Sequence, residues 1–179
     1  GVGIFWSIVL RPKGMAAKAQ VITLMTGVAV AKAVSLNTGL SPQIKWPNDV
    51  LINDKKVSGI LLESKASPTG VAYAVVGVGI NVNHTSADLP EELQLGASSL
   101  RLESGETVDR DALITQLFIE MESLYARLQK EDSAIILEQW RSFSATLGQH
   151  IRVMQHGKLI EGIAIDVNEG GALILRVEE

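Results

Sequence analysis

The chain has 179 residues, of which 46% are hydrophobic, so it is long enough for one well-filled domain or for a domain with a small appendage. It contains no cysteine, which excludes a disulfide framework, structural zinc of the cysteine type and thiol nucleophiles. The net charge is −4 and no basic stripe is present, so we expect no nucleic-acid binding by this part of the protein.

The N-terminal region predicts a strand followed by a helix. Residues 3–10 are rich in Ile, Val, Phe and Trp and end at Arg11-Pro12, which predicts a buried strand. Residues 16–36 are apolar almost all the way round, with a helix stop at Gly39, which predicts a core helix. The longest charge-free stretch of this region, residues 19–31, is shorter than the roughly 20 residues needed to cross a bilayer, so we expect no membrane span.

Short segments with β character come next, and they predict an antiparallel or mixed sheet. The segments are residues 43–46, 50–52, 55–63 and 71–81. Asn53-Asp54 predicts a two-residue hairpin turn because both residues tolerate positive φ, and residues 67–70 predict another turn.

The second half predicts helices and then a change to short strands. A polar surface loop at 84–95 precedes an amphipathic helix that ends at Leu128 and has Asp109 as its N-cap. A shorter helix is expected at 133–143. Three strands follow, at residues 149–155, 159–167 and 172–177. We therefore expect an α+β fold with a domain at 1–145 and a small β module at 146–179, which is too small to bury much core alone.

The first segment that could carry chemistry is Lys45-Trp46-Pro47-Asn48-Asp49, which joins two predicted strands. Proline presets φ, and Asn and Asp bond to nearby backbone, so these five residues alone favour a simple turn. The alternative is a rim of amide and charged groups that holds a phosphate and its magnesium.

Lys56 lies just past the predicted hairpin turn, three residues before Gly59. Strand alternation places Lys55 and Lys56 on opposite faces, so one of them points toward the side that Gly59 helps define. A cation there could pair with a carboxylate and then stabilise charge on a phosphate. The alternation does not decide which lysine points inward, and a lysine beside a hairpin is usually solvated.

Gly77 and Gly79 lie two residues apart on one strand face, which leaves a flat strip for a planar ligand or for a closely crossing element. A dinucleotide fingerprint is not expected, because a third glycine is missing at the required spacing. Asn81 is a neutral ligand suited to a triphosphate oxygen or a hydrated Mg²⁺. The three histidines are scattered without metal-ligand spacing, so no transition-metal site is expected.

Three segments in order resemble the biotin protein ligase family. They are Lys-Trp-Pro-Asn-Asp (45–49), Asn-Asp-Lys-Lys-Val-Ser-Gly-Ile-Leu-Leu-Glu (53–63) and Val-Gly-Val-Gly-Ile-Asn-Val-Asn (76–83). The resemblance implies a mixed sheet backed by helices, related to class II aminoacyl-tRNA synthetases and lipoate ligases, followed by a small SH3-like module. It also implies a two-step reaction: biotin and MgATP give biotinyl-AMP, and a lysine of a biotin carboxyl carrier domain then takes the biotinyl group.

By this resemblance, Lys56 is the catalytic lysine that contacts the biotin carboxylate and the nascent acyl phosphate. Asn48 and Asn81 match positions near the ATP phosphates and Mg²⁺, with Lys45 as a further phosphate neighbour. Asp49 matches a position tied to the sheet end and to dimer packing. The wall around the biotin rings would be formed by Gly59, Leu61, Gly77 and Gly79.

Family members also carry an upstream Ser/Thr-rich biotin-binding segment and a Gly-Arg-Gly-Arg type loop, which the printed sequence lacks. We therefore expect a fragment that is weakly active or inactive alone. Its partners would be the carrier domain of acetyl-CoA carboxylase or a similar protein and a second copy of itself, in the cytoplasm. Three alternatives stay open: lipoate or octanoate transfer, the effector-binding half of a biotin-responsive repressor, and an α+β binding module without chemistry.

Overall fold

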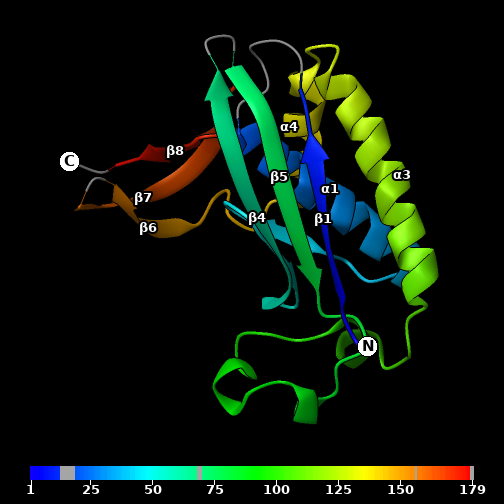
Figure 1. Ribbon diagram of the computed structural model, residues 1–179. Coiled ribbons are helices and arrows are strands. Elements are labelled where there is room, and N and C mark those ends of the chain that lie inside the picture. Colours follow the sequence, from blue (N-terminus) through cyan, green and yellow to red (C-terminus); the bar gives the residue numbers. More distant parts are fainter. Residues whose placement is uncertain (13–18, 68–69, 156, 178–179) are drawn as a thin grey trace.

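The computed structural model describes residues 1–12, 19–67, 70–155 and 157–177 (Figure 1). The first half of the chain contains β1 (Ile4–Leu10), α1 (Ala19–Thr38), β2 (Gln43–Lys45), β3 (Asp49–Ile52), β4 (Lys55–Ser67) and β5 (Gly70–Ile80). The second half contains the 3₁₀ turns η1 (Ser86–Asp88) and η2 (Glu91–Leu93), then α2 (Leu100–Ser104), α3 (Arg110–Leu128), α4 (Ser133–Phe143), β6 (His150–Gln155), β7 (Lys158–Val167) and β8 (Leu173–Arg176).

The strands form two sheets. The larger has the order β1-β5-β4-β3-β2, and the smaller has the order β6-β7-β8. Helices α1, α3 and α4 pack behind the large sheet, and its other face is open toward the viewer in Figure 1. The expected α+β fold with a sheet backed by helices is confirmed. The expected mixed sheet needs correction, because every described ladder is antiparallel and parallel pairing is limited to the isolated bridges Ile44–Ser144 and Lys56–Ala97.

Helix α1 is the centre of the core, as the sequence predicts. By length and composition it could cross a membrane, but 72% of its most apolar window is buried inside the fold, which accounts for the apolar residues all round it. The helix ends where Gly39 adopts a φ of 69°, the left-handed conformation that glycine adopts at little cost. The first turn of the predicted helix, residues 16–18, lies outside the described residues.

Helices α3 and α4 also follow the predicted pattern. Asp109 caps α3, since its carboxylate accepts hydrogen bonds from the backbone N–H groups of Asp111 and Ala112 at 2.9 and 3.1 Å. The buried apolar residues of α3 recur at helical spacing: Leu113, Leu117, Met121, Leu124 and Leu128. The short helix α2, capped by Ser99, is not among the predicted elements. Five residues are too few to show a period.

The sheet differs from the prediction at β1. Ile4 and Leu10 are buried, but Phe5 is 76% and Val9 is 49% exposed. The strand is therefore buried on one face only, because the helices cover one face of the sheet. The predicted Asn53-Asp54 turn is confirmed, with φ of 49° and 63°. The predicted turn at 67–70 includes residues 68–69, which lie outside the described part of the chain.

Candidate active site

The open face of the large sheet has two rows of paired residues that run across its strands. In one row Phe5, Gly79, Gly59 and Asp49 pair from β1 to β3. In the next row Ser7, Gly77 and Leu61 pair from β1 to β4. Because three of these positions are glycines, the middle of the open face has no side chains of its own and forms a depression between the side chains at its two sides.

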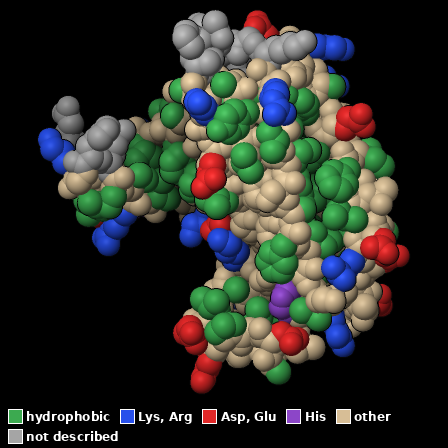
Figure 2. Space-filling model, in the orientation of Figure 1, with side chains coloured by type: hydrophobic (Ala, Val, Ile, Leu, Met, Phe, Trp, Pro, Cys, Tyr) green, Lys and Arg blue, Asp and Glu red, His purple; other side chains and the backbone are tan. Residues whose placement is uncertain are grey.

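This low area forms the floor of an open cavity of about 620 Å³. Six residues predicted from the sequence line it together: Asn48, Lys56, Gly59, Leu61, Gly77 and Gly79. The remaining lining residues come from β1, β4 and β5: Phe5, Trp6, Ser7, Ile60 and Val78. In the space-filling view, charged side chains gather at the hollow between the sheet and the loop that contains η1 and η2 (Figure 2).

The three glycines of the floor are not equivalent. A Cβ at Gly79 would lie 3.2 Å from Cε1 of Phe5, and a Cβ at Gly59 would lie 3.1 Å from Nζ of Lys56. Both glycines therefore make room for a neighbouring side chain that lies across them. A Cβ at Gly77 would have its nearest neighbour, Oγ of Ser7, at 3.7 Å, so this position leaves space for a ligand.

A β-bulge directs Lys56 to the open face. In a regular strand, residues three apart point to opposite faces, so Lys56 and Gly59 would be separated by the sheet. The pairing of β3 with β4 shifts register between Val50 and Leu51, and Val57 becomes an extra, buried residue on β4. Lys56 is thereby turned onto the face of Gly59. The bulge therefore decides which of the two adjacent lysines faces the site, which strand alternation alone does not.

The ammonium group of Lys56 forms an ion pair with Asp49, with Nζ 2.5 Å from Oδ1. The lysine side chain is 45% exposed, so the charge lies at the cavity wall and remains open to a ligand. Its backbone is fixed by two hydrogen bonds to a distant loop: its N–H donates to the Gly96 carbonyl, and its carbonyl accepts from the Ser98 N–H, both at 2.9 Å. The charge is therefore held at a defined place in the site.

A second cavity of about 450 Å³ adjoins the first at Lys56. Phe5, Lys56, Gly59 and Gly79 line both cavities. The second cavity is completed by Val57, Ser58, Asn81 and four residues of the loop after β5: Glu92, Leu93, Gly96 and Ala97. Lys56 thus lies between a space that is floored by glycines and a space that is bounded by a loop.

Asn48 and Asn81 lie on opposite sides of this junction, one in each cavity. The Asn48 amide donates to the Ile60 carbonyl at 2.7 Å, and the Asn81 amide donates to the Ser98 carbonyl at 3.0 Å. Within the described part of the chain, neither amide oxygen accepts a hydrogen bond, so each is available to a cation or an N–H donor. No group of three or more His, Asp or Glu with metal-site geometry occurs among the described residues.

Lys45 does not join this group. It is an exposed residue on the edge strand β2 and lines a separate cleft of about 840 Å³, together with Trp46, Pro47 and residues of the segment 144–154. The motifs in the sequence do not indicate four further lining residues, which are Phe5 and Ser7 on β1 and Glu92 and Leu93 in the loop. Alternation along β1 could have indicated Phe5 and Ser7, whereas nothing in the loop sequence indicates where it folds back.

Comparisons with known proteins agree with this geometry. A sequence model described as the Biotin/lipoate A/B protein ligase family matches residues 1–81. The biotin--[acetyl-CoA-carboxylase] ligase of Paracoccus denitrificans is 35% identical over 177 residues, which cover 95% of this chain and 72% of the relative. The bifunctional ligase/repressor BirA of Bacillus spizizenii is 36% identical over 179 residues, which are 100% of this chain and 55% of the relative. The chain thus spans about half the length of this second relative.

Solved structures show the same fold. The biotin protein ligase of Aquifex aeolicus in complex with biotin and ATP superimposes with a TM-score of 0.84 at 26% identity, covering 97% of this chain and 71% of that one. The sequence similarity to the Paracoccus ligase extends over most of both chains, and the fold agrees with it. The chain is therefore a member of the biotin protein ligase family.

Proposed function

We propose that this chain contributes the site at which biotin is activated by ATP and then transferred to a lysine of a carrier protein. The observation that carries the proposal is the place of Lys56 at the junction of two cavities, because a carboxylate and a phosphate must meet at one point for this reaction. The Aquifex aeolicus structure with biotin and ATP supports it, since that protein has this fold and binds both molecules.

In this proposal the cavity over Gly59, Leu61, Gly77 and Gly79 holds the biotin rings. The adjoining cavity holds ATP, whose phosphates lie at the junction of the two cavities, between Asn48 and Asn81. The space above Gly77 allows close packing of a fused ring system, and backbone groups of the strands would determine its orientation. The carboxylate of biotin then reaches Lys56 from one side, and the α-phosphate of ATP reaches it from the other.

Asn48 and Asn81 are proposed to face the phosphates with their amide oxygens, which would also hold Mg²⁺. When bound, Mg²⁺ would neutralise phosphate charge and orient the leaving pyrophosphate. The amide nitrogens are already held by backbone carbonyls, so the oxygens need no reorganisation to act as ligands. Lys45, which the resemblance places near the phosphates, lines a different cleft and has no phosphate role in this proposal.

The chemistry proceeds in two displacements. A carboxylate oxygen of biotin attacks the α-phosphorus, the bond from that phosphorus to the bridging oxygen of pyrophosphate breaks, and biotinyl-AMP forms. The amine of the carrier lysine then attacks the carbonyl carbon of the mixed anhydride, AMP leaves, and the new amide nitrogen loses a proton. Lys56 would stabilise the negative charge that develops on the phosphate in the first step and on the carbonyl oxygen in the second.

The finer assignments belong to the same proposal. The acceptor would be the biotin carboxyl carrier domain of acetyl-CoA carboxylase or a similar domain, as the name of the Paracoccus relative indicates for that protein. We further propose that the three-stranded sheet β6-β7-β8 is part of an SH3-like module, that the protein acts as a homodimer in the cytoplasm, and that this part does not bind nucleic acid. A repressor role would follow the Bacillus relative, whose name combines both activities.

Biotin-dependent exchange of pyrophosphate into ATP by a full-length protein that contains this sequence would test the proposal. We expect exchange with biotin and not with lipoate or octanoate, and mass spectrometry should detect biotinyl-AMP. Exchange that depends on lipoate would assign the chain to the lipoate side of the family. The absence of exchange with any of the three acids would refute adenylation altogether.

A further inference from the structure

We propose that Trp46 is a positioning residue through which the second sheet fixes the turn that carries Asn48 and Asp49. Trp46 is partly buried and donates two hydrogen bonds to segments at least 100 residues away. Its backbone N–H donates to Oγ1 of Thr146 at 2.8 Å, and its indole N–H donates to the carbonyl oxygen of Gly171 at 3.1 Å. The inference rests on the proposed function, because it concerns ligand binding at that site.

The carbonyl of Gly171 is held in a rigid turn between β7 and β8. Oδ1 of Asn168 accepts hydrogen bonds from the N–H groups of Gly170 and Ala172, at 2.9 and 3.0 Å. Gly171 has a φ of 79° and packs tightly on α1, since a Cβ there would lie 3.0 Å from Cγ of Gln20. The acceptor for the Trp46 indole is therefore fixed on two sides.

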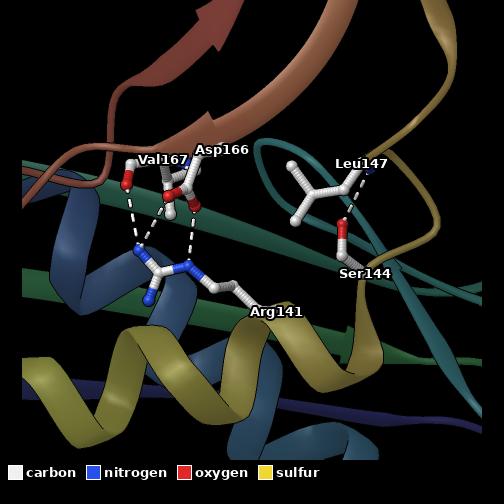
Figure 3. A network of polar contacts seen from close by, with 5 residues as sticks. All are labelled: Arg141, Ser144, Leu147, Asp166 and Val167. Carbon is white, nitrogen blue, oxygen red and sulfur yellow. Dashed lines mark hydrogen bonds and ion pairs between the residues drawn. The ribbon is translucent and has the colours of Figure 1, made fainter.

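A charged clamp next to this turn joins the second sheet to α4 (Figure 3). Nε of Arg141 donates to Oδ1 of Asp166 at 2.6 Å, and Nη2 donates to the Val167 carbonyl at 3.2 Å. On the linker between α4 and β6, Oγ of Ser144 accepts from the N–H of Leu147 at 3.2 Å. The second sheet is thus joined to the first domain at sites that lie outside both ligand cavities.

Trp46 connects this fixed acceptor to the residues of the site. It begins the turn between β2 and β3, and Asn48 follows two residues later. Asn48 forms two hydrogen bonds with Ile60. Its backbone carbonyl accepts from the Ile60 N–H at 3.0 Å, and its side-chain amide donates to the Ile60 carbonyl at 2.7 Å. Asp49 pairs with Lys56. A tilt of the turn would therefore move an amide oxygen and the partner of the central cation together.

The effect should be larger for ATP than for biotin. Two glycines of the proposed biotin wall, Gly77 and Gly79, pair with β1 and β4, whereas the third, Gly59, pairs with Asp49 at the end of the turn. The proposed phosphate ligand Asn48 is in that turn. Loss of one hydrogen bond at Trp46 should raise the KM for ATP about fivefold and leave the KM for biotin within about twofold.

Trp46→Phe in the full-length protein tests this inference, because it removes the indole N–H and keeps an aromatic ring. Trp140→Phe is the matched control, because the Trp140 indole nitrogen is buried without a hydrogen-bond partner among the described residues. This substitution should lower the free energy of unfolding and leave both KM values unchanged. Asn168→Ala, on the other side of the contact, should reproduce the rise in the ATP KM. The double variant should show less than the sum of the two effects.

A second measurement does not depend on activity. Hydrogen exchange of the Trp46 indole N–H, followed by NMR, should speed up in Asn168→Ala, whereas that of Trp140 should not change. Equal rises in both KM values for Trp46→Phe, or an unchanged ATP KM, would overturn the inference, as would unchanged exchange. If the unmodified protein shows no biotin-dependent exchange of pyrophosphate, the proposed function fails. If the unmodified protein shows this exchange and Trp46→Phe has the same KM values, only the inference fails.

Discussion

Replacement of Lys56 by Met removes the central charge of the site and keeps a side chain of similar length. In the folded protein the main direct loss is the ion pair with Asp49. The lysine is 45% exposed, so this pair should contribute less than about 1 kcal/mol to the free energy of unfolding. We therefore expect the variant to fold and its melting temperature to change by only a few degrees.

The effect on the reaction should be much larger. Two unit charges about 3 Å apart interact by about 5 kcal/mol at an effective dielectric of about 20, and by about 1.4 kcal/mol in water. A half-exposed lysine lies between these limits, at about 3 kcal/mol. Because each 1.36 kcal/mol changes the rate about tenfold, kcat for adenylation should fall about 150-fold in Lys56→Met.

The assay is biotin-dependent exchange of pyrophosphate into ATP by the full-length protein. Lys55→Met is the matched control, since Lys55 is adjacent on β4 and lines neither of the two cavities that meet at Lys56. We expect Lys55→Met to keep kcat within about twofold of the unmodified protein. A kcat for Lys56→Met within threefold of the unmodified protein would refute the reasoning, because a charge at the junction of the cavities would then contribute nothing to the transition state.

Three further predictions concern the floor, the second sheet and a helix cap. Gly77→Val should raise the dissociation constant for biotin by roughly 10- to 200-fold, because its methyl groups extend into the cavity while its Cβ meets nothing closer than 3.7 Å. Gly77→Ala should have a smaller effect, and titration calorimetry would measure both dissociation constants. Hydrogen bonds from the Arg141 side chain and then from the Val167 backbone lower the pKa of Asp166 below its usual 3.8, so its contribution to stability is complete above that value and is lost as the pH falls through the lowered pKa. Urea unfolding between pH 6 and pH 3 should therefore show a steeper loss for the unmodified protein than for Asp166→Asn, and equal slopes would contradict this. Asp109→Ala removes the cap of α3 and should lower the free energy of unfolding by about 0.5–2 kcal/mol in urea, with the ligand KM values unchanged.

The sequence by itself determined the elements that depend on local chemistry. The long apolar run of α1 and the spacing along α3 predicted their helices, because a helix buried on all sides needs apolar residues throughout and a helix buried on one face leaves a helical period. The Asn53-Asp54 turn followed from the tolerance of both residues for positive φ. The ordered motifs also gave six residues that the structure places in one cavity, including the glycines of its floor.

Only the tertiary structure decided which lysine enters the site and which residues surround it. Lys56 faces Gly59 because of a bulge, and a bulge is set by pairing between β3 and β4 and not by the residues of one strand. Phe5 reaches the cavity by pairing across more than 70 residues with Gly79, and the loop at 92–97 forms a wall by bonding to Lys56. Lys45 is left outside for the same reason: contacts between residues far apart in the sequence are fixed by packing, which leaves no local period to read.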